Sequence, residues 1–301
     1  MALLDRAIVK LLPAVPKPVV QRISSRYIAG PELRDATRVV RQLNAGGKMA
    51  TVDVLGEEVC DAEATRRFVD EYGDVLAEIE RTGLDSTVSV KPTALGLNLN
   101  LDLCRENLTA VVANAAARGN FVRIDMEDSS TTSDTLRLYR ELREAGHDNV
   151  GFVLQAYMRR SVADIHALAD LQPNVRLCKG IYVEPPEVAF TDFDAVRANF
   201  VRALDELLGV GAYVGIATHD EWLIQRGLER VAGLGREDYE FQMLLGVREH
   251  RADELVATGH RLRIYVPFGR EWYGYSLRRL QENPKVAGYI AGDTLSRLLG
   301  R

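Results

Sequence analysis

The sequence predicts an α/β fold, a closed (βα)8 barrel that begins after a helical N-terminal segment. Two observations favour it. Eight short apolar or β-branched runs each precede an amphipathic segment, and strands this apolar that are joined by helical crossovers form parallel sheets covered by helices. No GxGxxG or GxxxxGK[ST] loop follows any of these runs, which disfavours a nucleotide-binding open sheet.

The elements alternate in order along the chain. The expected strands are 49–55, 86–92, 121–128, 150–157, 175–182, 212–218, 239–246 and 261–269. The helices that follow them are 61–83, 104–119, 133–146, 161–172, 194–211, 221–235, 248–260 and 271–283. Several of these helices begin at Asp or Ser and end at Gly, the usual start and stop signals. Residues 47–301 therefore form the predicted barrel domain.

Residues 1–46 are predicted to be an N-terminal helical extension. Its first residues place Leu4, Ile8, Leu11 and Leu12 on one stripe of an amphipathic helix. Charged residues and Pro13 interrupt the apolar run, so it fits neither a signal peptide nor a membrane span. We expect this helix to pack on the main domain, with peripheral membrane contact as the alternative.

Composition restricts the function. The 301 residues carry a formal net charge of -5, so nucleic acid is not an expected partner. The three cysteines form no CxxC pair, which argues against a disulfide framework or a zinc knuckle and fits a reducing, cytoplasmic compartment.

Polar residues gather late in the predicted strands, where the active sites of (βα)8 barrels lie. They are Lys91, Asp125, Glu127, Asp128, Gln155, Tyr157, Arg176, Lys179, Tyr182, Thr218, His219, Asp220, Gln242 and Tyr265. Charged groups within apolar strands cost several kcal/mol unless they are paired or functional. The sequence therefore predicts a site at the carboxyl ends of the strands.

The segment after the last strand, WYGYSLRRLQENP, carries two adjacent arginines. On a helix, Tyr275 shares a face with Arg278 and Arg279, and Glu282 lies one turn beyond. If this last helix caps the barrel mouth, the arginine pair suits a carboxylate or phosphate. The alternative is a solvated surface helix with a weak Arg278–Glu282 pair.

The strand-end residues also suggest two other chemistries, a Schiff base and a catalytic metal. Lys91 could form a Schiff base, as in a class I aldolase, but nearby acids such as Asp125 would keep its ammonium charged. We therefore favour an anion-binding or ion-pairing Lys91. The other histidines offer no ligand spacing to His219, so no catalytic metal is expected.

Several motifs together resemble the proline dehydrogenase family, in its small single-function bacterial form. In chain order they are VSVKPTALG, RIDMED, GFVLQAY, VRLCKGIYVEPPEVAF, IATHD, EFQMLLG and RIYVPFGREWYGYSLRRLQENP. RYIAGPEL in the N-terminal segment is also similar. The resemblance implies a distorted (βα)8 TIM-type barrel that binds FAD noncovalently.

The resemblance also implies a reaction, the oxidation of L-proline to Δ1-pyrroline-5-carboxylate with electrons passed to a membrane quinone. Pyrroline-5-carboxylate dehydrogenase would be the neighbouring enzyme. The enzyme would be cytoplasmic, with peripheral contact at the inner face of the membrane as an extension.

Residue roles follow from the matching motifs. On the substrate side, Arg278 and Arg279 match the carboxylate clamp, assisted by Lys91 and braced by Asp125. Tyr265, Tyr275 and Leu177 match the walls around the ring, with Tyr182 just outside them. The matching flavin contacts are Met126, Gln155, Arg176 near N5, Lys179, Gly180, Ile181, Thr218, His219 and Glu282. Three positions depart from the family pattern: Ile181 stands for alanine, Asp220 for asparagine and Leu245 for an aromatic residue.

A third possibility is an inactive barrel that serves as a partner-binding scaffold. Such a relative should have lost a charged site residue, and this chain retains every charged residue that the motifs require.

Overall fold

The strands close into a barrel. A computed structural model describes residues 26–56, 59–235, 237–273 and 276. All eight strands pair in parallel in chain order, and β8 returns to pair with β1. Their bounds are β1 Met49–Val54, β2 Ser86–Val90, β3 Val122–Ile124, β4 Val150–Gln155, β5 Asn174–Cys178, β6 Tyr213–Ala217, β7 Tyr239–Leu244 and β8 Leu262–Phe268. The predicted fold class is confirmed.

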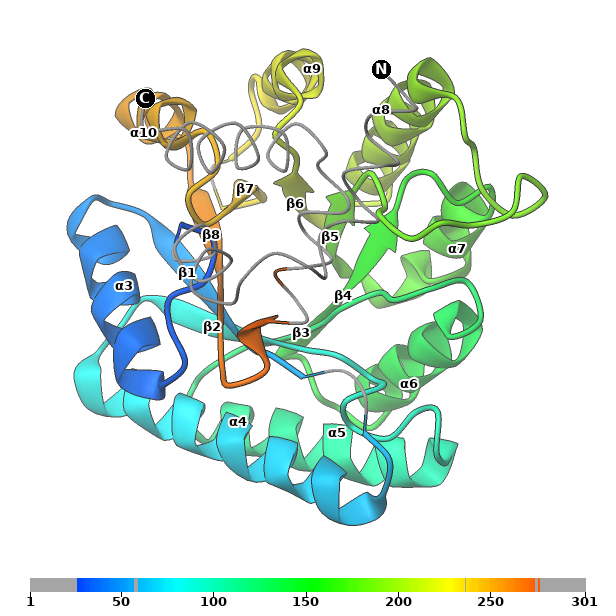
Figure 1. The fold of residues 1–301 in the computed structure, drawn as a ribbon. Coiled ribbons are helices and arrows are strands. Elements are labelled where there is room, and N and C mark those ends of the chain that lie inside the picture. Colours follow the sequence, from blue (N-terminus) through cyan, green and yellow to red (C-terminus); the bar gives the residue numbers. More distant parts are fainter. Residues whose placement is uncertain (1–25, 57–58, 236, 274–275, 277–301) are drawn as a thin grey trace, which may run out of the picture.

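Helices surround the strands (Figure 1). The ring consists of α4 Ala62–Thr82, α5 Leu101–Ala117, α6 Thr132–Glu144, α7 Ser161–Ala167 with the short η2 Ala169–Leu171, α8 Phe193–Gly209, α9 Glu221–Val231 and α10 Glu249–Ala257. These match the helices expected between successive strands.

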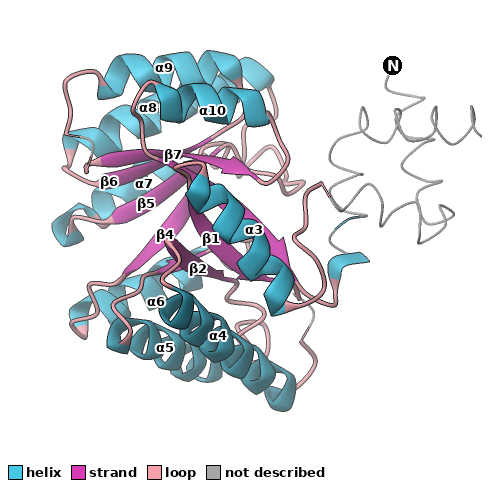
Figure 2. Ribbon diagram, turned by 90° about the vertical axis from the view of Figure 1, so that its left-hand side faces the viewer, coloured by secondary structure: helices cyan, strands magenta, loops and turns pink. Residues whose placement is uncertain are grey.

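The helix α3, Leu33–Ala45, belongs to the segment that was predicted as an extension. It packs against β8 and β1 on the outside of the barrel, as the side view shows (Figure 2). This is the seat that a helix following β8 would take in a regular (βα)8 barrel. The division of the chain at residues 46 and 47 stays a prediction.

The eighth expected helix, 271–283, is described only at its start. Residues 272, 273 and 276 are helical, and the Ser276 hydroxyl donates to the carbonyl oxygen of Trp272 at 2.6 Å, one turn back. Tyr275, Arg278, Arg279 and Glu282 lie outside the described residues, as does the predicted stripe at residues 4–12.

The strand side chains that point into the barrel are polar, whereas those that point outward, toward the surrounding helices, are apolar. In β1, for example, Val52 and Val54 belong to the apolar core, whereas Thr51 and Asp53 alternate with them. In β8, Ile264 is in the same core and Arg263 forms an ion pair with Glu240 of β7. Polar groups from different strands therefore meet inside the barrel, and their pairing sets the architecture of the site.

Every strand ends earlier than predicted, and the difference is largest at β3 and β5, where it places site residues in loops. β3 ends at Ile124, after which the side chain of Glu127 accepts a hydrogen bond from the Thr93 backbone N–H at 2.9 Å. β5 ends at Cys178 because Gly180, at φ +104°, leaves the extended conformation. Lys179 and Tyr182 therefore follow the strand.

Candidate active site

A cavity of about 770 Å³ lies at the carboxyl ends of the strands, where the sequence predicted a site. Eleven of the predicted site residues line it: Lys91, Asp125, Met126, Gln155, Arg176, Lys179, Gly180, Ile181, Tyr182, His219 and Tyr265. Its other lining residues include Glu127, Cys178, Val183 and Gln242. Seven strands, β2 to β8, and their following loops thus bring these residues together.

A buried ion pair stands beside this cavity. Nζ of Lys91 lies 2.9 and 2.8 Å from the two carboxylate oxygens of Asp53, whose side chain is 0% exposed. Burial raises the pKa of Asp53 to about 6, and the charge of Lys91 opposes this rise. Near neutral pH both groups are therefore charged, and they fix each other.

Asp125 joins the same group of side chains from the end of β3. It accepts hydrogen bonds from the Ser89 hydroxyl at 2.6 Å, the Tyr265 hydroxyl at 2.8 Å and Nη1 of Arg176 at 2.8 Å. Nζ of Lys91 lies 3.8 Å from its second oxygen. We call Asp53, Lys91, Asp125, Arg176 and Tyr265 the charged cluster.

The cluster holds Arg176 rigidly. Its Nε donates to Oε1 of Gln242 at 2.6 Å, and its guanidinium lies 5.2 Å from the centre of the Tyr265 ring. Two carboxylates and two cations give the cluster no net formal charge. Because Asp125 accepts hydrogen bonds from three different side chains, its carboxylate positions its neighbours.

The surroundings of Lys91 disfavour the aldolase alternative. A Schiff base needs a neutral amine, whereas carboxylates at 2.8 and 3.8 Å favour the ammonium form. Lys91 is thus arranged as a cation.

The loop after β5 forms another wall of the cavity. Gly180 packs so tightly that a Cβ on it would lie 2.1 Å from Cδ1 of Tyr157. In the same loop, Ile181 and Val183 line the cavity and are 42% and 103% exposed. Without a Cβ at residue 180 the loop can lie directly against the Tyr157 ring, and this packing fixes the position of the wall.

Asp220 anchors the base of that loop from the start of α9. It accepts two hydrogen bonds from Arg197, at 2.9 and 2.7 Å, and lies 3.4 Å from Nζ of Lys179. Its side chain also accepts from the backbone N–H of Trp222 and so caps α9. The Arg197 hydrogen bonds hold the pKa of Asp220 below its usual value.

The ring of His219 is oriented by a hydrogen bond to the backbone. Its Nε2 accepts the backbone N–H of Leu244 at 2.9 Å, which requires the proton of the neutral ring to be on Nδ1. In the described part of the chain, no group of three or more His, Cys, Asp or Glu residues is placed to hold a metal ion.

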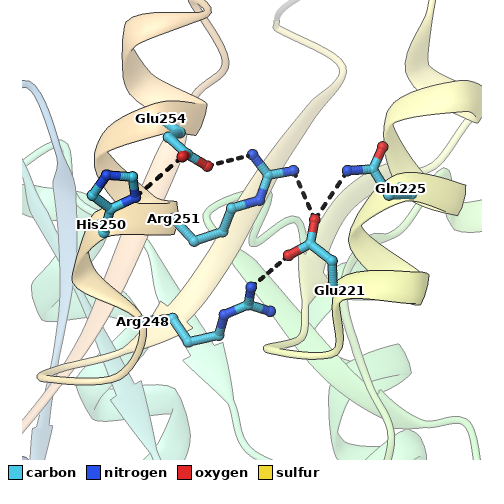
Figure 3. Close-up of a pocket in the computed structure, with 6 residues that line it drawn as sticks. All are labelled: Glu221, Gln225, Arg248, His250, Arg251 and Glu254. Atoms are coloured by element: carbon cyan, nitrogen blue, oxygen red, sulfur yellow. Dashed lines mark hydrogen bonds and ion pairs between the residues drawn. The ribbon is translucent and has the colours of Figure 1, made fainter.

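A second pocket, of about 430 Å³, lies on the outside between α9 and α10 (Figure 3). Arg251 bridges Glu221 at 3.1 Å and Glu254 at 2.9 Å, and Arg248 contacts Glu221 at 2.6 Å. Because these arginines are already paired at the surface, the pocket is a salt-bridge network rather than a catalytic centre.

The comparison with known proteins decides the family. A family model described as proline dehydrogenase matches residues 36–291. The chain belongs to the proline dehydrogenase family.

Curated relatives agree along most of their length. The chain is 38% identical over 263 residues to proline dehydrogenase 2 of Bacillus subtilis, covering 87% of this chain and 86% of that protein. It is 35% identical over 279 residues to the proline dehydrogenase of Deinococcus radiodurans, covering 91% and 90%. The resemblance inferred from the motifs is confirmed.

Solved structures show the same fold. Proline utilization A (PutA) from Bdellovibrio bacteriovorus superposes with a TM-score of 0.82 at 23% identity, over 92% of this chain. This chain spans 36% of the length of that PutA chain. The likeness shows that the two chains share the barrel fold.

Among the predicted contacts that the structure describes, two do not line the cavity. Leu177 is fully buried in the apolar core, because it alternates along β5 with Arg176 and so points to the other side of the strand. The expectation that it walls the substrate pocket is corrected accordingly. Thr218 is also buried, and its hydroxyl accepts the backbone N–H of Asp220 at 3.1 Å, so it supports the loop.

Asp53 was missed among the strand-end residues. Its signal is a lone charge within the run MATVDVL, the one predicted strand that contributes no residue to the polar set at the strand ends. Arg197, which holds Asp220, lies within a helix and carried no comparable signal.

Proposed function

We propose that this chain oxidises L-proline to Δ1-pyrroline-5-carboxylate, with noncovalently bound FAD in the cavity and a quinone as the final electron acceptor. The charged cluster carries this proposal. In a chain of this family, it places a fixed cation, Lys91, and a phenol, Tyr265, at one wall of a cavity whose facing loop suits a planar cofactor.

The residues around the loop after β5 fit a flavin. Gly180 contributes only backbone to the lining, and the Gln155 side chain, whose amide nitrogen donates to the Glu127 carbonyl oxygen at 2.6 Å, lines the same cavity. Met126, Lys179 and His219 line the same space. A bound flavin supplies the acceptor for two electrons, and the protein supplies orientation.

Arg176 is proposed as the cation that faces the electron acceptor. Its hydrogen bonds to Asp125 and Gln242 fix the guanidinium before any ligand arrives. A preorganised cation stabilises negative charge that develops nearby without reorganising during the reaction.

Substrate binding requires further positive charge. Proline brings a carboxylate, and the two cations of the cluster are already balanced by Asp53 and Asp125. The clamp proposed for Arg278 and Arg279 would add that charge, with the phenols of Tyr265, Tyr182 and Tyr275 around the ring. The oxidation then removes a hydride from C5 and a proton from nitrogen, which leaves a C=N bond.

The surrounding pathway is proposed on the same basis. The imine product is electrophilic and would pass to pyrroline-5-carboxylate dehydrogenase, while a quinone would place the enzyme near a membrane. None of the described helices is both long and apolar enough to cross one. We propose a cytoplasmic protein with peripheral contact at the inner face.

The test is an anaerobic titration. The purified chain should be yellow, release FAD rather than FMN on denaturation, and lose its absorbance near the flavin maximum when proline is added. A protein that stays colourless after incubation with FAD would contradict the proposal. Borohydride with a carbonyl substrate should trap no adduct on Lys91.

A further inference from the structure

A second internal cavity lies at the opposite, amino-terminal end of the barrel. It has a volume of about 210 Å³. Its lining consists of Thr51, Thr87, Phe121, Arg123, Asn174, Arg176, Tyr213, Glu240, Gln242, Arg261 and Arg263. Arg176 and Gln242 line both cavities, so this hydrogen-bonded pair separates the amino-end cavity from the active-site cavity.

Positive charge exceeds negative charge around the amino-end cavity. Four arginines line it, against Glu240 as the one carboxylate among the described lining residues. Arg176 has its counterion, Asp125, on the other side of the partition. Glu240 is engaged by Nε of Arg263 at 2.7 Å. The charges of Arg123 and Arg261 are thus left in excess.

Arg123 is the most deeply buried of these cations, at 4% exposure. Its Nη1 donates to the carbonyl oxygens of Phe152 at 3.0 Å and Asn174 at 2.6 Å. No carboxylate in the described residues lies within ion-pair distance of it. Burial, followed by the charge of Arg176, lowers the pKa of Arg123 to about 9, so it remains a cation at neutral pH.

The backbone makes room for this cation. At Gly151 in β4, a Cβ would lie 2.5 Å from Nη1 of Arg123. Burying a cation without a countercharge costs several kcal/mol of folding free energy. An anion bound beside Arg123 would offset that cost.

Arg261 and Arg263 direct N–H groups at a poor acceptor. Their Nη2 atoms lie 3.6 and 3.3 Å from the sulfur of Met49. A thioether accepts hydrogen bonds weakly, so an oxygen anion would compete readily for the same donors. Arg261 and Tyr213 are only half-buried, which leaves an approach from solvent at this end of the barrel.

We propose that the amino-end cavity binds a small oxyanion of the size and charge of inorganic phosphate. Guanidinium groups match tetrahedral oxyanions through paired N–H donors, and two excess positive charges match a phosphate dianion. The volume suits a free ion rather than a nucleotide. This site is independent of the flavin and of proline, so it can stand or fall separately from the proposed function.

Calorimetric titration of the full chain with phosphate, in a buffer free of other oxyanions, tests the site. Ionic strength is held constant with chloride, because exposed charges are screened by salt and phosphate at high concentration stabilises proteins generally. We expect saturable binding at low millimolar phosphate or below. Arg261→Gln should weaken it at least about tenfold, as expected for one lost charge-assisted hydrogen bond.

Arg226→Gln is the matched control, because Arg226 is a surface arginine paired with Glu229 on α9. It should bind phosphate as the wild type does. Equal affinity in wild type and Arg261→Gln, or an equal response to chloride, would overturn the proposal.

A second measurement needs no variant. Phosphate should slow the modification of Arg261 by phenylglyoxal, read by peptide mass spectrometry, and leave that of Arg226 unchanged. Unprotected Arg261 at saturating phosphate would also contradict the site, whatever the folding of the variants.

Discussion

Both carboxylate oxygens of Asp53 contact Nζ of Lys91, at 2.9 and 2.8 Å, although Asp53 is completely buried. A buried ion pair seldom stabilises a protein more than apolar side chains of the same volume would. We therefore expect the main role of this pair to be positional: it fixes the Lys91 ammonium at the wall of the candidate active-site cavity.

The first prediction concerns this fixation. Asp53→Asn should raise the KM for proline about tenfold, because Lys91 would lose one of its two carboxylates and with it a defined position. Steady-state kinetics against proline measure the change. Asp253→Asn, which removes the exposed partner of Lys48, is the control and should leave KM unchanged. An unaltered KM in Asp53→Asn would show that the position of Lys91 does not matter for proline binding.

The second prediction is a pH dependence of stability. In the folded chain burial raises the pKa of Asp53 from 3.8 to about 6, so the folded state binds more protons than the unfolded state between these values. Its contribution to stability is therefore present at low pH and is lost as pH rises through about 6.

Urea unfolding of wild type and Asp53→Asn from pH 4 to 7 tests this. The unfolding free energy of wild type relative to the variant should fall as pH rises from 3.8 through about 6, by on the order of a few kcal/mol. A relative stability that rises with pH would show that Lys91 outweighs burial.

The third prediction concerns the loop after β5. Gly180→Ala adds a Cβ that would lie 2.1 Å from the Tyr157 ring at a backbone φ of +104°, so the loop must shift. Flavin content per purified chain should fall sharply, and the dissociation constant should rise at least about tenfold.

Gly211→Ala is its matched control. Gly211 has φ +72°, but a Cβ there would meet nothing within 4 Å. It should cost about 1–2 kcal/mol of stability through backbone strain alone and retain its flavin. Equal flavin loss in both variants would point to general destabilisation instead.

The barrel could be predicted because its signal is local. Each strand is a short apolar run, and each helix carries its own periodicity and end signals. The contents of the cavity depend on register, which is not local. Asp53 lies opposite Ser89, two residues before Lys91, only because β1 pairs with β2 in this register. No feature of the sequence near Asp53 indicates that Lys91 is its ion-pair partner.

Leu177 is the opposite case, a residue whose place in the structure follows from a local rule. Its neighbour Arg176 faces the cavity, so strand alternation alone would have placed Leu177 in the core, where the structure has it. The alternation of side chains along β5 therefore predicts the position of Leu177 better than the family motif does.

The fourth prediction tests the proposed carboxylate clamp. The cations of the charged cluster are balanced by Asp53 and Asp125, so proline needs another anchor. Arg278→Met should raise the KM for proline by roughly 30- to 1,000-fold, or about 2–4 kcal/mol, with little effect on FAD affinity. Arg270→Met, at an exposed position after β8, is the control. Parallel loss of flavin and proline binding would contradict this role for Arg278.

The fifth prediction concerns Asp220, where the resemblance to the family leads us to expect asparagine. Asn would still cap α9, but it would lose the ion pair with Arg197 and the contact with Lys179. Asp220→Asn should therefore lower the unfolding free energy by about 2 kcal/mol at neutral pH. Because Arg197 lowers the pKa of Asp220 in the folded state, this contribution is present above 3.8 and is lost as pH falls below that value.

Urea unfolding of both proteins between pH 3 and 7 measures the difference. It should stay constant from pH 7 to about 5 and shrink on further acidification. Asp205→Asn, which removes a half-exposed partner of Arg230, should change stability by less than about 1 kcal/mol at every pH. If Asp220→Asn were as stable as wild type at neutral pH, the Arg197 pair would serve the position of Lys179 beside the cavity rather than the stability of the fold.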